Sequence, residues 1–183
     1  MWLFAIAAAS CAVAASALRL YRVRTALHVS PAELARTLGR NADADRLGRM
    51  AAEVRASGAV WEADLLDDIL AATSGAARVA LANEHLDDLA ARLDWGRGIP
   101  IAAARLSIAA PLCAVFFALA REKVAWSAIL LPLACSGVGA VASLWAGHQA
   151  EKIAAGLREG VDLLVARALR AASSDASSGG DSQ

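Results

Sequence analysis

The histidines and cysteines, whose side chains can ligate a metal or attack a substrate, are few in this chain and lie far apart in the sequence. There are three of each: His28, His85, His148, Cys11, Cys113 and Cys135. The histidines form no cluster that suggests a metal site or a catalytic triad, and the cysteine spacing matches no zinc motif. All three cysteines fall in apolar stretches, where packing is the favoured role. We therefore expect no enzyme activity, no metal and no cofactor.

Two further features that could do chemistry have simpler interpretations. The segment Gly96-Arg97-Gly98 lacks the preceding strand and the third glycine of a dinucleotide-binding loop. His85 is expected to form a solvated surface pair with Glu84. His148 lies just past an apolar stretch and is expected to be an interfacial residue, with a role as a proton relay as the alternative.

The zero net charge and the pI of about 6.8 give no basic excess for binding nucleic acid.

The elements that must position all these residues include three strongly apolar stretches, at residues 2–18, 106–120 and 126–147. None contains an acidic residue or a lysine, and about twenty apolar residues suffice to cross a bilayer as a helix. The second stretch needs residues 101–105 for this length, with Arg105 snorkelling to the headgroups; a buried helix of a soluble core is its alternative. The sequence predicts an all-α integral membrane protein with three transmembrane helices, a helical cytoplasmic segment and an extended C-terminal helix.

The predicted organisation follows from these stretches. It comprises transmembrane helix 1 (1–18), a cytoplasmic helical segment (19–100), transmembrane helix 2 (101–120), a short outer turn (121–125), transmembrane helix 3 (126–147), a cytoplasmic amphipathic helix (148–172) and a disordered tail (173–183). Arginines 19, 22 and 24 follow the first stretch, so the positive-inside rule places the N-terminus outside the inner membrane and the C-terminus in the cytoplasm. A cleaved signal peptide ending at Ala15-Ser16-Ala17 is the alternative for the first stretch, but it lacks a basic n-region.

The cytoplasmic segment shows only helical periodicity. Ser30-Pro31-Ala32-Glu33 has the pattern of a capping box that starts a helix, and apolar residues recur at helical spacing from there to Ser57-Gly58. A second helix is expected around Trp61, and a third after Thr73-Ser74-Gly75. The acidic pairs at 67–68 and 87–88 fit solvated helix faces.

Small residues mark the third apolar stretch. One face of this helix carries small residues at spacings of four, three and four: Ser136, Ala140, Ser143 and Gly147. Beside this face, Gly137 and Gly139 have no side chains. Small residues let helices approach closely in lipid. The face is expected either to pack tightly within or between subunits or to form a wall around a partner helix.

This layout resembles that of the MotA/TolQ/ExbB stator family. Ser107-Ile108-Ala109-Ala110-Pro111-Leu112 is similar to the alanine-rich start of the family's second span, and residues 133–149, with Gly137 and His148-Gln149, are similar to its third span. The resemblance implies an inner-membrane homo-oligomer, a pentamer by analogy, around a single-span ExbD/TolR-like protein that carries an acidic residue. Such a complex couples an ion gradient to work on the cell envelope.

The chain differs from the family at positions of the second and third spans where family members carry polar or acidic side chains. Positions that carry pore threonines or an acidic residue in the family are Ala118, Ala134 and Ile129 here. The departures favour a subunit that scaffolds an acid-bearing partner over one that conducts protons itself. The candidates for pore lining or helix packing are Ser107, Ala118, Ala134, Ser136, Gly137, Gly139, Ser143 and Gly147.

A structural membrane scaffold is the alternative function, such as a secretion or pilus platform similar to the GspF/TadC type. Proteins of this type also combine cytoplasmic helices with membrane hairpins. Acidic residues within 62–68 or 84–88 could then contact a motor ATPase.

Overall fold

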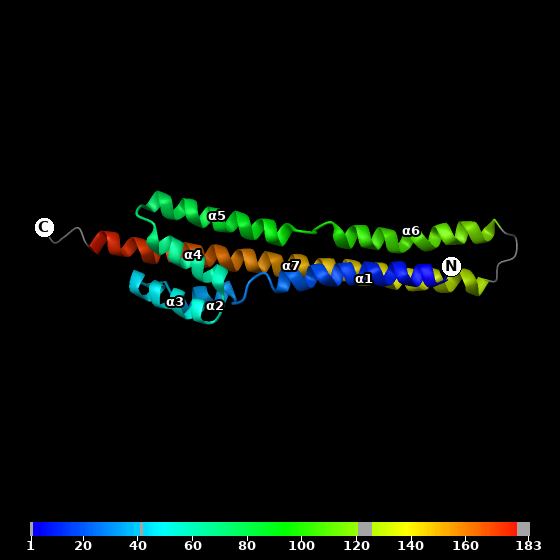
Figure 1. Cartoon of the computed structure of the whole chain (residues 1–183), viewed down its shortest axis with the longest axis horizontal. Helices are drawn as coiled ribbons and strands as arrows, with labels where there is room; N and C mark the ends of the chain where they lie inside the picture. The colour runs from blue at the N-terminus through cyan, green and yellow to red at the C-terminus, as the bar shows by residue number, and fades with distance from the viewer. Residues whose placement is uncertain (1, 41, 121–125, 179–183) are drawn as a thin grey trace. The chain divides into compact units, whose positions relative to one another are not determined.

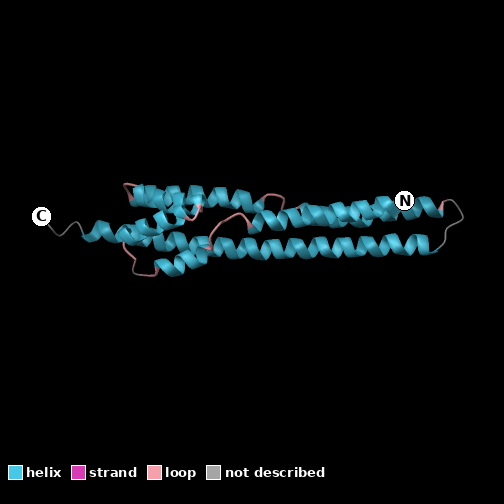
Figure 2. Ribbon diagram, turned by 60° about the horizontal axis from the view of Figure 1, so that its bottom comes forward, coloured by secondary structure: helices cyan, strands magenta, loops and turns pink. Residues whose placement is uncertain are grey.

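The computed structural model describes residues 2–40, 42–120 and 126–178, and this part of the chain is built from helices without a strand (Figure 2). The helices are α1 (Trp2–Arg24), α2 (Pro31–Leu38), α3 (Ala44–Ala56), α4 (Val60–Ala71), α5 (Gly75–Asp94), α6 (Ile99–Leu119) and α7 (Trp126–Ser178). Three helical stretches are long and apolar enough to cross a membrane, judged by length and composition. The all-α prediction and its three span-length apolar helices are confirmed for the described residues.

The chain divides into two compact units. The apolar unit consists of Met1–Arg24 and Asp94–Ile153, and the polar unit of Thr25–Leu93 and Ala154–Gln183. Helix α7 belongs to both units, because it runs for 53 residues without interruption across the boundary.

In the apolar unit, α1, α6 and the first part of α7 run alongside one another (Figure 1). Near approaches between Ala9 and Gly139, and between Arg19 and Glu151, show that α1 and α7 run in the same direction. Helix α6 runs the opposite way, since Pro100 at its start lies beside Gly147. This arrangement is the one expected for three successive spans.

The apolar unit has small residues inside and large apolar residues outside. The buried hydrophobic residues of its described part are mostly alanines, whereas Leu3 is 84% exposed and Phe116 and Phe117 are each 72% exposed. Large apolar side chains normally drive burial in water, and a broad exposed apolar surface marks a membrane or protein interface. The side-chain distribution therefore suits a lipid surrounding.

The polar unit has a conventional core of large aliphatic side chains. Leu38, Leu47, Leu65, Leu66, Ile69, Leu89, Leu93, Val161 and Leu164 are all essentially inaccessible. The last part of α7 contributes to this core and is also bonded to its neighbours. Arg167 donates to the carbonyl of Ala35 in α2, and Arg78 of α5 donates to the carbonyl of Ala172 at 2.6 Å.

The helix expected from Ser30 to the Ser57-Gly58 break is in fact two helices, α2 and α3. Gly39 ends α2 with φ of 76°, a conformation that glycine adopts most easily. Asp43 then caps α3 by accepting from the backbone N–H of Arg46 at 2.8 Å. Ser30 does precede α2, but its side chain makes no capping hydrogen bond, so the expected capping box is absent.

Helix boundaries also differ from those expected. Helix α1 continues past residue 18 to Arg24, and α7 continues past residue 172 to Ser178. Helix α6 begins at Ile99, so Pro100 occupies its first turn, where a missing N–H costs little. The expected outer turn at 121–125 and the end of the tail lie outside the described residues.

Candidate functional site

Two buried serines join α6 to α7 inside the apolar unit. Ser107 donates its hydroxyl proton to the carbonyl of Ser136 across the interface at 3.1 Å, and Ser136 donates to the carbonyl of Pro132 one turn earlier at 2.7 Å. Neither side chain is accessible beyond 1%. Hydroxyl groups that bond across helices contribute modestly to helix association in lipid.

Two glycines of α7 allow its neighbours to come close. A Cβ added at Gly139 would lie 2.9 Å from the hydroxyl of Ser107 and 3.0 Å from the Cβ of Ala9, and one added at Gly147 would lie 2.7 Å from the Cβ of Pro100. Gly137 differs, because it is exposed and a Cβ there would meet nothing within 4 Å. Gly139 and Gly147 thus serve contacts within the chain, whereas Gly137 lies on an open surface.

The structure brings most of the predicted site residues together in the interior of the apolar unit. Ser107, Ser136, Gly139, Ser143 and Gly147 are all buried there. Ala134 and Gly137 are exposed instead, and the side chain of Ala118 lies outside the described residues. The serine face of α7 therefore packs against α1 and α6 of the same chain and leaves no room for a partner helix on that face.

Ser143 has a feature that its neighbours lack. Its hydroxyl is fully buried and has no hydrogen-bond partner among the described residues. A buried unpaired hydroxyl costs about 1–3 kcal/mol. The residue is thus a source of instability in the core of the apolar unit.

An ionic cluster closes one end of the apolar unit, and sequence reasoning missed it. Arg19 of α1 is 2% exposed and its NH2 group lies 2.9 Å from Oε1 of Glu151 in α7. Arg97, between α5 and α6, places its Nε 3.4 Å from the same oxygen. The carboxylate of Glu151 in α7 therefore contacts both α1 and the connection that precedes α6. In the sequence, Arg19 directly follows the first apolar stretch. We used it only to predict the orientation in the membrane and did not consider that it could form an ion pair.

An aromatic contact extends this cluster. The guanidinium carbon of Arg22 lies 4.0 Å from the centroid of the Trp95 ring, a cation–π distance. Arg22 follows Arg19 by three residues, so the two side chains leave α1 on similar sides. We call Arg19, Arg22, Trp95, Arg97 and Glu151 together the arginine cluster.

In the polar unit, a buried carboxylate holds the segment that leads from α1 to α2. Glu62 of α4 is 1% exposed and accepts hydrogen bonds through Oε1 from the backbone N–H groups of His28 at 2.6 Å and Val29 at 3.0 Å. Hydrogen bonds to a charged acceptor are stronger than neutral ones. Glu62 is therefore a structural clamp rather than a surface acid.

Each acid of the pair Asp67 and Asp68 contacts a basic side chain of the polar unit. Arg55 donates to Asp67 and to Asp64, each at 2.7 Å. The hydrogen bond that Arg55 donates to Asp67, and next the one that it donates to Asp64, raise the pKa of Arg55 above its ordinary value. Asp68 lies 2.7 Å from Nε2 of His85.

His85 is not the solvated surface residue that was expected. Besides Asp68, its ring contacts that of Trp61 edge to face, with centroids 5.8 Å apart, and its side chain is 19% exposed. The indole of Trp61 in turn donates to Asp88 at 3.3 Å. The sequence periodicity predicted that Trp61 and His85 lie on separate helices. Their contact depends on how α4 packs on α5, which the periodicity does not predict.

Apolar grooves lie on the surface that the described residues of the apolar unit form. One, of about 730 Å³, lies between α1 and α7 and is lined by residues such as Ala9, Val13, Ala134 and Val138. Another, of about 460 Å³, lies between α1 and α6. The described residues contain no group of three His, Cys, Asp or Glu side chains that could hold a metal ion.

Comparison with known proteins gives no relative: no family model, no curated protein and no solved structure matches this chain.

Proposed function

We propose that this chain is the multi-span subunit of a stator-like complex of the inner membrane, similar in layout to MotA, TolQ and ExbB. It forms a homo-oligomer, a pentamer by analogy, around single-span partner helices of the ExbD/TolR kind. Its role is mechanical rather than enzymatic: it holds the partner and transmits motion between the membrane and the cytoplasm.

The observation that carries this proposal is the continuity of α7 together with its bonds at both ends. In the apolar unit the helix is tied to α1 through Glu151 and Arg19. In the polar unit it is tied to α2 through Arg167 and Ala35, and to α5 through Ala172 and Arg78. An unbroken helix fixed in this way in each unit is suited to pass a rotation or tilt from one to the other.

The composition of the apolar unit supports a scaffold that does not conduct protons itself. A proton path through lipid needs titratable or polar groups, which are costly there and mark function. Helix α6 and the described part of α7 before Glu151 contain no acidic residue. The acid for conduction would then come from the partner.

We place the contacts with other chains on the exposed side of α7. Ala134 and Gly137 are small and open there, and Ala134 also lines the groove between α1 and α7. A helix without bulky side chains can approach such a surface closely.

The secretion-platform alternative is weakened by the internal pairing of its proposed docking acids. Glu62 is buried, and Asp64, Asp67, Asp68 and Asp88 each bond to a side chain of the polar unit. Few carboxylates of these segments are left to attract a motor ATPase.

Determination of the oligomer mass in mild detergent, with identification of co-purifying proteins, tests the proposal. We expect a homo-oligomer with a single-span membrane protein attached. A monomer that carries no such partner would count against the stator function.

A further inference from the structure

Helix α6 carries a single charged side chain, that of Arg105. This side chain is exposed and forms no ion pair or hydrogen bond with any residue that the structure describes. Arg19 and Arg97 differ from it, because both contact the carboxylate of Glu151. Ionisable residues in membrane segments are costly, and they usually pair with another group and mark function. Arg105 is therefore a candidate contact for a group that another molecule supplies.

Two contacts of α6 place Arg105 along the apolar unit. Pro100, in the first turn of α6, lies beside Gly147 of α7. Ser107 lies beside Gly139, which is closer to the start of α7. Arg105 falls between these two levels, and it follows the first residue of α6 by a rise of about 9 Å. It therefore lies within the length of the apolar helices rather than at the end that carries the Arg19–Glu151 pair.

The surface of α6 around Arg105 is apolar and exposed. Residues at positions −4, +3, +7 and +11 from Arg105 share its side of the helix. They are all large and apolar and are between 41% and 72% exposed: Ile101, Ile108, Leu112 and Phe116. Because Ile101 lies one turn nearer to the charged end of the unit, Arg105 interrupts this apolar face rather than ending it.

A second copy of the chain does not supply a negative charge at this depth. The sequences of α1, α6 and the part of α7 before Glu151 contain no acidic residue. Copies related by a rotation axis along the membrane normal hold equivalent residues at equal depth. The Glu151 of a neighbouring copy would thus remain at the charged end, and a carboxylate beside Arg105 must come from a different chain.

We propose that Arg105 and the exposed apolar face around it bind a transmembrane helix of the partner protein, and that an acidic residue of this helix pairs with Arg105. The inference rests on the proposed function, which places the chain in the membrane beside a single-span, acid-bearing partner. Charge complementarity carries it, since pairing offsets the cost of each charge inside the membrane. This contact on α6 adds to the contacts placed on the exposed side of α7.

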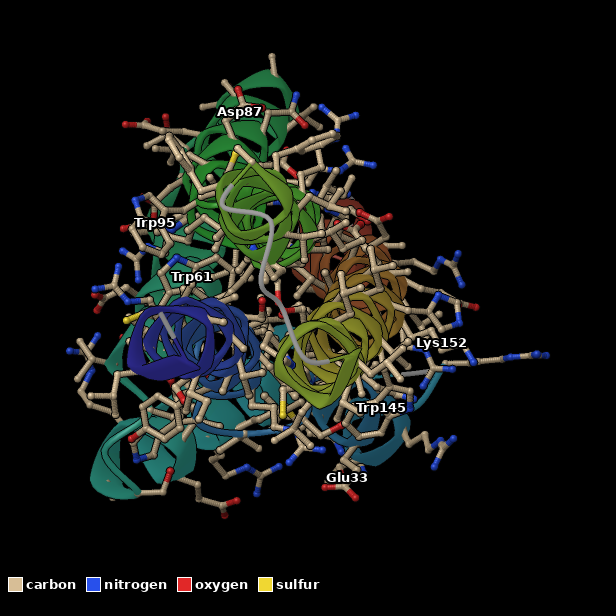
Figure 3. All side chains as sticks on the ribbon, turned by 90° about the vertical axis from the view of Figure 1, so that its right-hand side faces the viewer. Glu33, Trp61, Asp87, Trp95, Trp145 and Lys152 are labelled. Atoms are coloured by element: carbon tan, nitrogen blue, oxygen red, sulfur yellow. The ribbon has the colours of Figure 1, made fainter. Side chains whose placement is uncertain are left out.

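Lys152 supplies a matched control. It is an exposed basic residue of the same unit and follows Glu151 directly, so it lies at the charged end. Viewed end-on, Lys152 lies with Trp145 on the side of α7 that faces away from α6 (Figure 3). Lys152→Gln and Arg105→Gln each remove one positive charge, but only Arg105→Gln alters the proposed contact.

The test measures binding of a synthetic single-span peptide to the full-length chain by fluorescence energy transfer in phosphatidylcholine vesicles. The peptide consists of leucine and alanine with one aspartate, placed as far from its end as Arg105 is from the start of α6. A second peptide has asparagine instead. The wild type and Lys152→Gln should bind the aspartate peptide roughly tenfold more tightly than the asparagine peptide, the scale of polar contacts between helices in lipid. Arg105→Gln should lose this preference, whereas Arg105→Lys keeps the charge and should retain it.

Three results would overturn the proposal. Equal binding of the two peptides by the wild type would assign the charge of Arg105 to lipid phosphates, and this comparison does not depend on the folding of a variant. A preference that persists in Arg105→Gln would place the contact elsewhere. A preference lost in Lys152→Gln as well would reduce it to general surface charge. Because the probe is a synthetic peptide, a negative result here remains distinguishable from a failure of the stator proposal, which the oligomer mass and the co-purifying proteins test.

Discussion

Two glycines of α7, two residues apart, should respond in opposite ways to the same substitution. A methyl group at Gly139 would lie 2.9 Å from the Ser107 hydroxyl, a distance that real Cβ atoms essentially never show, and 3.0 Å from the Cβ of Ala9, which is tighter than most real Cβ contacts. A methyl group at Gly137 meets nothing within 4 Å. Gly139→Ala and Gly137→Ala therefore form a matched pair on one helix.

The expected magnitudes follow from packing and helix propensity. Overpacking a close contact costs about 1–3 kcal/mol, so Gly139→Ala should be less stable than Gly137→Ala by about that amount. Gly137→Ala should stay within about 1 kcal/mol of the wild type, on the stabilising side, because alanine favours a helix more than glycine does. The propensity gain is common to both variants, so their difference isolates the steric effect.

Thermal unfolding of the purified protein in one detergent, followed by circular dichroism, measures this difference. Gly139→Ala should melt several degrees below Gly137→Ala. Equal melting temperatures would refute the helix packing described for the apolar unit. Gly137→Leu adds a test of the open surface: it should weaken the oligomer while the isolated chain keeps its melting temperature.

Three further substitutions test individual contacts by the same unfolding measurement. Glu62→Ala removes two charge-assisted hydrogen bonds from the α1–α2 segment and should cost about 3 kcal/mol or more; an unchanged melting temperature would contradict the clamp. Glu151→Gln leaves the buried Arg19 without its counter-charge and should cost about 3 kcal/mol, whereas the double change with Arg19→Leu should recover part of this loss. Ser143→Ala removes an unpaired buried hydroxyl and should be neutral or stabilising, while Ser107→Ala loses an interhelix bond and should destabilise; the reverse order would argue against both assignments.

The helices of this chain could be predicted because composition and periodicity determine them locally. The apolar stretches are long and free of carboxylates, so helix α1, helix α6 and the start of helix α7 were expected. The break between α2 and α3 was missed because one helix was continued from Leu38 to Leu47, although these residues are nine positions apart and a continuous helix would place them on opposite faces. The conformation of Gly39 and the cap at Asp43 show where the break lies.

The candidate site was predictable only in part. Helical spacing correctly grouped Ser136, Ser143 and Gly147 on one face of α7, but it could not say whether that face meets another chain or its own neighbours. Burial against α1 and α6 decides that question. The Arg19–Glu151 pair joins residues 132 positions apart, a separation that no local pattern encodes.

The function proposed here depends on the chain crossing the membrane with its polar unit in the cytoplasm. Labelling of single cysteines in intact cells tests this most directly, after Cys11, Cys113 and Cys135 have been replaced by alanine. Thr73 and Ala120 are exposed and described, so each can carry the reporter thiol. A membrane-impermeant maleimide should label Ala120→Cys in intact cells and Thr73→Cys only after permeabilisation. Labelling of Thr73→Cys in intact cells would contradict the proposed topology and, with it, the stator function.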